Sequence, residues 1–180
     1  MHVVVSGGTG FLGRALEQVL TSRGHRVSAL TRRARADRPG DIEWTPNGEV
    51  GSWANALTGA DVLVNLAGEG MADARWTSTR KAALLESRLA ATSSLVKAVQ
   101  HIENGPRVFV SASGVGYYGP RGDEPIREDT PAGPRTSHPL RSRSAPLVAE
   151  YPYGGGNFLV LVPRNSHAPG SVAPTSKSSS

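Results

Sequence analysis

The chain has 180 residues, no Cys and a formal net charge of +5. This length suits one domain with a sizeable core, and the absence of Cys excludes disulfides and thiolate metal sites and fits a reducing compartment. Residues 1–133 hold 15 basic and 14 acidic residues, whereas residues 134–180 hold five and one. Because the excess charge lies in the last segment alone, we expect no nucleic-acid partner.

Several other classes of protein are also disfavoured. An apolar strand follows Met1 directly, and no apolar run approaches the roughly 20 residues that a membrane helix needs. The five His residues are scattered without the spacing of metal ligands. We therefore expect a cytoplasmic protein with no signal peptide, no membrane contact and no metal site.

The first 133 residues alternate strand and helix patterns. Short apolar runs predict strands buried on both faces, at residues 2–6, 26–30, 42–44, 61–67 and 107–113. Apolar residues at helical spacing predict a helix over residues 12–20 that stops near Gly24, and a second over residues 85–99. This alternation predicts an α/β, Rossmann-type, doubly wound parallel sheet of order 3-2-1-4-5, which is incomplete.

The turn after the first strand, SGGTGFLG, is unusually rich in glycine. It fits G-x-G-x-x-G with Gly8, Gly10 and Gly13, and G-x-x-G-x-x-G with Gly7, Gly10 and Gly13. In both alignments the first glycine permits a tight turn, Gly10 lets a pyrophosphate approach the backbone, and Gly13 lets helix and strand pack closely. Free N–H groups and the helix dipole would favour the phosphates. We expect dinucleotide binding; the alternative is a turn that binds nothing.

The residues after the second predicted strand bear on the choice of dinucleotide. An acidic residue there would bind the ribose 2′-hydroxyl of NAD, and an Arg would accommodate the 2′-phosphate of NADP. Thr31, Arg32 and Arg33 occupy this place, and no carboxylate does. The sequence favours NADP over NAD, with a solvated basic loop as the alternative.

Four segments together resemble a known family: GGTGFLG, DVLVNLAGE, RWTSTRKAALLESRLAATSSLV and VSASGVGYYG. They are similar to the extended short-chain dehydrogenase/reductases, and within them to the atypical branch of NAD-dependent epimerase/dehydratase-like proteins. The likeness covers residues 1 to about 133. It implies a Rossmann fold and an NADP cofactor more firmly than it implies a reaction, because most members of this branch lack an assigned substrate.

The resemblance also implies cofactor contacts. Two segments carry them: the phosphate loop, whose variable places are filled by Phe11 and Leu12, and the segment after the fourth strand, which would lie beside adenosine and ribose. The implied contacts are Gly7, Gly10, Phe11, Leu12, Gly13, Leu66, Ala67 and Gly68. The alternative for Ala67 and Gly68 is that small residues are needed there only for close packing, and the two explanations are compatible.

The catalytic positions match the family only in part. Ser113 aligns with the family serine that hydrogen-bonds the reacting oxygen, although a serine at a strand end is also a common cap. In this superfamily a Tyr acts as general acid/base, and a Lys four residues later lowers its pKa. The chain contains no Tyr-x-x-x-Lys. Ordinary dehydrogenase catalysis is therefore in doubt.

Two charged residues are candidates for substrate binding. Arg88 falls near the place where extended members carry a pocket asparagine, and it would suit a phosphate or carboxylate. Glu69 follows the NLAG segment and would lie near the nicotinamide. The alternatives are an ion pair on the helix surface for Arg88 and a loop charge for Glu69.

The likeness to the family ends near residue 133. Residues 134–180 hold seven Pro and nine Ser, a composition that rarely builds a packed core, so we expect a disordered, basic tail. We expect the C-terminal substrate domain of extended members to be absent, as in a truncated or frameshifted product. The far edge and one face of the sheet would then be partly uncovered, which favours self-association.

Three functional hypotheses follow from these observations. The first is an NADP-dependent oxidoreductase or epimerase that acts on a small carbonyl or sugar-nucleotide substrate. The second is a module that binds NADP without turnover, as the missing Tyr and Lys pair suggests. The third is an inactive remnant that neither folds stably nor binds.

Overall fold

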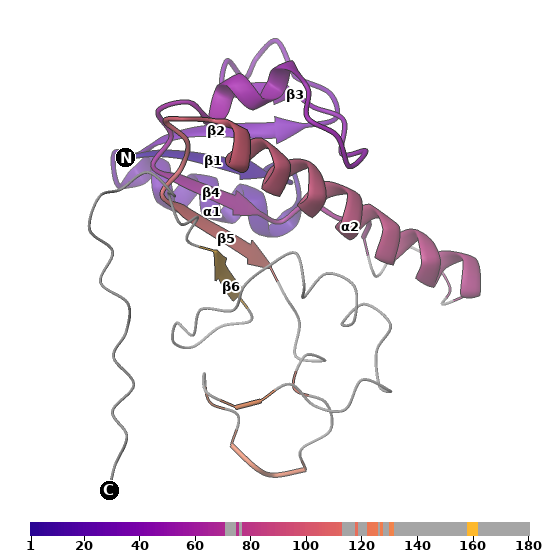
Figure 1. The fold of residues 1–180 in the computed structure, drawn as a ribbon. Coiled ribbons are helices and arrows are strands. Elements are labelled where there is room, and N and C mark those ends of the chain that lie inside the picture. Colours follow the sequence, from indigo (N-terminus) through magenta and orange to yellow (C-terminus); the bar gives the residue numbers. More distant parts are fainter. Residues whose placement is uncertain are drawn as a thin grey trace, which may run out of the picture.

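The protein is a six-stranded sheet flanked by helices, seen here in a computed structural model (Figure 1). The structure describes residues 1–70, 75, 77–112, 118, 122–125, 127, 130–131 and 158–161. The strands are β1 (His2–Ser6), β2 (Arg26–Thr31), β3 (Asp41–Glu43), β4 (Val62–Asn65), β5 (Val108–Ala112) and β6 (Phe158–Leu161). The helices are α1 (Phe11–Ser22), the short 3-10 helix η1 (Ser52–Leu57) and α2 (Ser78–His101).

The sheet confirms the predicted strand order. Its order is β3-β2-β1-β4-β5-β6, and the first five strands are parallel. The central strand β1 pairs on both sides, so that Val4 stands in register with Ser28 of β2 and Leu63 of β4. A parallel sheet with helices on both faces buries its inner strands completely, which explains the continuous apolar run of β1. The fold is therefore of the Rossmann type.

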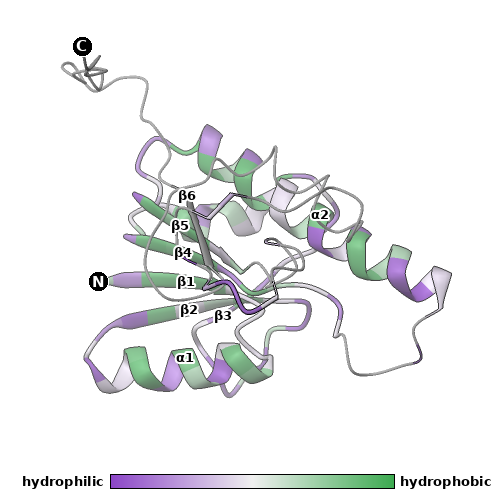
Figure 2. Cartoon of the chain, turned by 90° about the horizontal axis from the view of Figure 1, so that it is seen from below, coloured by the Kyte–Doolittle hydropathy of each residue, from purple (hydrophilic) through white to green (hydrophobic). Residues whose placement is uncertain are grey.

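The helices lie on opposite faces of the sheet (Figure 2). On the α1 face, Val3 and Val5 pack with Leu16 and Leu20. On the other face, a larger cluster from the sheet, η1 and α2 includes Val4, Leu30, Leu57, Leu63, Leu95 and Phe109. Because side chains alternate along a strand, β1 contributes to both layers of the core.

The helix α1 begins and ends close to the predicted positions, whereas α2 begins seven residues before the predicted start at residue 85. The helix α1 ends at Ser22, and Gly24 follows with a φ of +75°, where its N–H donates to Thr21 O at 2.9 Å. The helix α2 is longer than its apolar spacing predicted, because Thr77 caps it by accepting from the N–H of Arg80 at 3.1 Å. Within the described residues, neither helix is long and apolar enough to cross a membrane.

The strand β6 differs from the expectation for the C-terminal segment. No strand was predicted after residue 133, and the edge of β5 was expected to be open. The structure pairs β6 antiparallel to β5, with Phe109 opposite Leu161 and Ala112 opposite Phe158. An open edge presents unpaired backbone groups, and FLVL is a short apolar run that can satisfy them. The rest of residues 134–180 lies outside the described residues.

Candidate functional site

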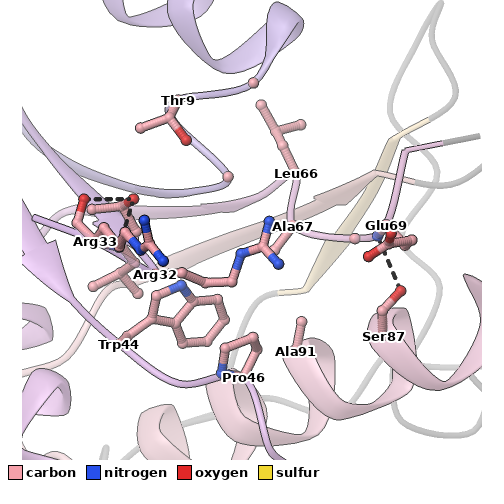
Figure 3. Close-up of a pocket in the computed structure, with 15 residues that line it drawn as sticks. Thr9, Arg32, Arg33, Trp44, Pro46, Leu66, Ala67, Glu69, Ser87 and Ala91 are labelled. Carbon is pink, nitrogen blue, oxygen red and sulfur yellow. Dashed lines mark hydrogen bonds between the residues drawn. The ribbon is translucent and has the colours of Figure 1, made fainter. Parts of the chain in front are cut away.

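A pocket of about 650 Å³ opens at the carboxyl ends of β1, β2 and β4 (Figure 3). This is the edge at which open α/β sheets bind ligands. The residues that line it are Gly7, Thr9, Gly10, Leu30, Thr31, Arg32, Arg33, Trp44, Pro46, Leu66, Ala67, Gly68, Glu69, Ser87 and Ala91. Nine of the predicted site residues are among them.

The glycine turn forms one wall of the pocket. Gly7 has a φ of +75°, and a Cβ there would lie 2.8 Å from the carbonyl carbon of Leu66. A Cβ on Gly13 would lie 2.3 Å from Gly7 O and 2.6 Å from Gly8 Cα, so this glycine lets α1 pack on the turn. On Gly10 it would meet only Gly7 O, at 3.2 Å. Gly10 is thus the glycine whose missing side chain leaves room in the pocket itself.

The start of α1 faces this wall. Gly10 is the N-cap of α1 and has no side chain. The first N–H groups of the helix therefore have no hydrogen bond to a capping side chain. Phe11 and Leu12, which the resemblance implied as cofactor contacts, do not line the pocket; their side chains are 83% and 57% exposed. The arrangement suits an anion at the helix N-terminus.

The end of β2 brings two arginines to the pocket. Thr31 is buried, and its Oγ1 accepts from the N–H of Arg33 at 3.4 Å, which turns the chain after the strand. Neither Arg32 nor Arg33 forms an ion pair with a carboxylate of the described residues. Figure 3 shows the side chain of Arg32 extending into the pocket above Trp44. Within the described part of the chain, this end of the pocket therefore holds positive charge that no carboxylate pairs.

The end of β4 is held by a buried polar network around Asn65. The side-chain Nδ2 of Asn65 donates to Thr92 Oγ1 at 3.1 Å and to Ser111 Oγ at 3.2 Å. Its Oδ1 accepts from Ser6 Oγ at 2.8 Å and from the N–H of Ala67 at 3.2 Å. The network joins β1, β4, β5 and α2, and it fixes the backbone of Ala67 where it lines the pocket.

A cluster of charged residues closes the opposite end of the pocket from Arg32 and Arg33. The N–H of Glu69 donates to Ser87 Oγ at 3.0 Å, and Arg80 Nη1 donates to Glu69 Oε1 at 2.9 Å. Arg88 lies just behind the lining: its Nη2 donates to Glu69 O at 3.5 Å, and its guanidinium lies against Gly68. Burial lowers the pKa of the Arg88 guanidinium. Glu69 and Arg88, both predicted substrate residues, are therefore neighbours.

Some residues of the pocket were not predicted from the sequence, and one predicted residue lies outside the part of the chain that the structure describes. Ser113, the candidate oxygen donor, follows β5 and lies outside the described residues. Sequence reasoning missed six lining residues: Thr9, Leu30, Trp44, Pro46, Ser87 and Ala91. Trp44 and Pro46 follow β3, so the rule that ligands bind at carboxyl ends of parallel strands would have indicated them. Within the described ranges, no three His, Asp or Glu side chains gather as a metal ion would require.

Comparison with known proteins places this site in a family. The sequence profile of the NAD dependent epimerase/dehydratase family matches residues 3–177. The chain belongs to the NAD-dependent epimerase/dehydratase family. Relatives in this family include the human epimerase family protein SDR39U1, 39% identical over 135 residues, and YfhF of Bacillus subtilis, 35% identical over 133. The two matches cover 74% and 72% of this chain, and the chain spans only 43% of either relative.

Solved structures agree with this assignment to the family. The crystal structure of human SDR39U1 with NADPH matches with a TM-score of 0.63 at 39% identity, over 73% of this chain and 43% of that one. MoeE5 in complex with UDP-glucose and NAD matches with a TM-score of 0.58 at 28% identity, over 74% and 43%. These two structures, which contain different dinucleotides, therefore share this fold.

Proposed function

We propose that this chain binds NADP(H) in the pocket at the carboxyl end of the sheet. One observation carries the proposal: the glycine turn opens α1 on one side of the pocket, and on another side Arg32 and Arg33 have no carboxylate partner among the described residues. The backbone from Gly7 to Gly10 and the start of α1 would hold the pyrophosphate. Ala67 and Gly68 would lie along the nucleoside.

The choice of NADP over NAD rests on the two arginines. A 2′-phosphate would find two guanidinium groups at the end of β2, and no acidic residue there would bind a free 2′-hydroxyl. Human SDR39U1 was crystallised with NADPH, which favours the same choice, whereas MoeE5 was crystallised with NAD. The dinucleotide preference is therefore the sharpest test of the proposal.

Affinity measurements on three proteins make this test. We expect the parent to bind NADPH at least about tenfold more tightly than NADH, because a charge-assisted hydrogen bond contributes about 1.5–3 kcal/mol. Arg32→Asp should reverse the preference by repelling the 2′-phosphate. Arg23→Asp, which changes the same charge on the exposed far end of α1, should leave the ratio unchanged. Equal affinities in the parent would contradict the proposal.

For the reaction, we propose an oxidoreductase or epimerase that acts on a small carbonyl or sugar-nucleotide substrate. The bound nicotinamide would supply or accept a hydride, and Ser113 would donate a hydrogen bond to the reacting oxygen. The missing Tyr-x-x-x-Lys favours a second candidate, a module that binds NADP(H) without turnover. A screen for turnover of carbonyl and sugar-nucleotide substrates with NADPH-loaded protein separates the two. A titration with NADPH, followed by nicotinamide fluorescence, identifies an inactive remnant if the fluorescence does not change.

A further inference from the structure

Arg88 occupies an unusual position on α2. Leu84, Ala91 and Leu95 are each at most 1% exposed, and Arg88 lies four residues after the first and three before the second. Residues at these spacings share one face of a helix, so Arg88 lies on the face that packs toward the sheet. Charged side chains are rarely placed on a buried face unless they have a partner.

The described residues provide almost no such partner. The one hydrogen bond of the guanidinium within them is the long one to Glu69 O, at 3.5 Å, and no carboxylate there forms an ion pair with Arg88. Nearby Arg80 differs, because it pairs with Glu69 at 2.9 Å. Burial lowers the pKa of Arg88, but an arginine keeps its proton, so the site holds a half-buried positive charge with no carboxylate partner among the described residues.

The backbone makes room for this guanidinium. A Cβ on Gly68 would lie 2.5 Å from Arg88 Nη1 and 3.0 Å from its Cζ, so the guanidinium packs directly against Gly68 in the pocket wall. The neighbouring Glu69 carboxylate would repel an anion, but it is engaged by Arg80. This end of the pocket also lies away from Arg32 and Arg33, as Figure 3 shows for Glu69 and Ser87.

We propose that Arg88 binds an oxyanion, a phosphate or carboxylate group, on a second ligand that lies beside the dinucleotide at the Glu69 end of the pocket. A guanidinium presents a planar fork of donors that matches either group with two parallel hydrogen bonds. The inference rests on the proposed function, since the dinucleotide fills the rest of the pocket. It assigns an anionic substrate to this protein.

The test uses the full chain saturated with NADPH and adds inorganic phosphate, or acetate as the carboxylate probe, in place of chloride at constant ionic strength. Binding is read from the rise in the thermal midpoint. We expect the midpoint of the parent to rise with one of the two anions. Arg88→Gln should need at least about tenfold more anion for the same rise, while its NADPH affinity stays within about twofold of the parent. Arg107→Gln, which removes an 86% exposed guanidinium at the start of β5, should respond like the parent.

Three results would overturn the inference. The first is no response of the parent to either anion, and the second is an equal response of parent and Arg88→Gln. The third is a loss of NADPH affinity in Arg88→Gln as large as its loss of anion response, because Arg88 would then bind the cofactor. If Arg88→Gln does not fold, Arg88→Lys decides: a weaker response than the parent's supports the inference, and an equal one overturns it.

The same titration separates this inference from the proposed function. If the parent does not bind NADPH, the proposed function fails, and the anion titration is repeated on the unliganded protein. A difference between parent and Arg88→Gln would then still support an oxyanion site at Arg88. No difference there would overturn it independently of the cofactor.

Discussion

The amino and carboxyl ends of the central strands both carry polar groups, but they use them differently. At the amino end, the imidazole of His2 contacts Ser28 Oγ at 3.0 Å and Arg26 Nη2 at 2.7 Å. The backbone N–H of His2 donates to Asp61 Oδ2 at 2.7 Å and lowers the pKa of that carboxyl. Here the donors and acceptors satisfy one another within the chain.

At the carboxyl end, Glu69 pairs with Arg80, but three other arginines have no carboxylate partner among the described residues. Ser6 and Asn65 bond inward, which holds the strand ends rigidly. Beyond them, Arg32, Arg33 and Arg88 form no ion pair with a carboxylate of the described residues. Positive charge that is not paired within the described residues, above rigidly held strand ends, is the pattern expected of a site for an anionic ligand.

The largest expected effect concerns the packing of α1 on the glycine turn at the carboxyl end of the sheet. Gly13→Ala forces a methyl group against Gly7 O and Gly8 Cα, which are backbone atoms that cannot move aside. We expect a loss of about 3 kcal/mol in the free energy of unfolding, measured by urea denaturation. The control is Gly24→Ala, where φ is +75° but no atom lies within 4 Å, so only backbone strain of about 1 kcal/mol applies. Equal losses in both would mean that α1 does not pack on the turn as described.

The next effect concerns the network below the pocket. Asn65→Leu keeps a similar volume but leaves the hydroxyls of Thr92 and Ser111 without this partner, and it frees the N–H of Ala67. We expect about 2 kcal/mol of destabilisation, with NADPH affinity reduced in the folded fraction. Asn55→Leu, on the exposed side of η1, should change neither quantity appreciably. Unchanged NADPH affinity in Asn65→Leu would show that the network supports the sheet alone.

A third effect separates ligand binding from folding. Gly10 has a φ of −73°, and an added Cβ would meet only Gly7 O, at 3.2 Å. We expect Gly10→Ala to shift the unliganded thermal midpoint only slightly but to weaken NADPH binding at least about tenfold, which is about 1.4 kcal/mol. Gly105→Ala, in the loop before β5, is the control and should leave affinity unchanged. A large loss of stability with affinity retained would make the loop structural.

The sequence predicted the parts of the molecule that local rules determine. The strand order follows from the alternation of strand and helix patterns along the chain, and the glycine turn from the spacing of Gly7, Gly10 and Gly13, which is a local backbone requirement. Arg32 and Arg33 were predicted because their distance from the turn is set by one helix and one strand. Each of these features depends on residues that are close in sequence.

Features that depend on distant contacts were not predicted. The Asn65 network joins residues up to 59 positions apart, as in its bond with Ser6. Trp44 reaches the pocket because β3 pairs with β2, and β6 was missed because its partner β5 lies far away along the chain. The arrangement of Glu69, Arg80 and Arg88 also needs the packing of α2 on the sheet. Such contacts follow from the tertiary fold rather than from a motif.

The smallest expected effect concerns His2, which contacts Ser28, Arg26 and Asp61 at the amino end of the sheet. Burial, followed by the charge of Arg26, lowers the pKa of His2 below 6.5, although Asp61 opposes the shift. The folded protein therefore binds this proton more weakly than the unfolded chain does. The resulting stability is fully present above pH 6.5 and falls as the pH drops through the window between 6.5 and the lowered pKa.

His2→Gln removes this titration and keeps a hydrogen-bonding side chain beside Ser28. We expect the parent to lose more stability than His2→Gln between about pH 7.5 and about pH 5.5, by a small amount because the imidazole is partly exposed and solvent screens it. Urea denaturation at a series of pH values measures the difference. The two curves should run parallel above pH 6.5, which serves as the internal control. If they remain parallel at acid pH, His2 accepts its proton as readily in the folded protein as in the unfolded chain, and the cluster is more open than its distances indicate.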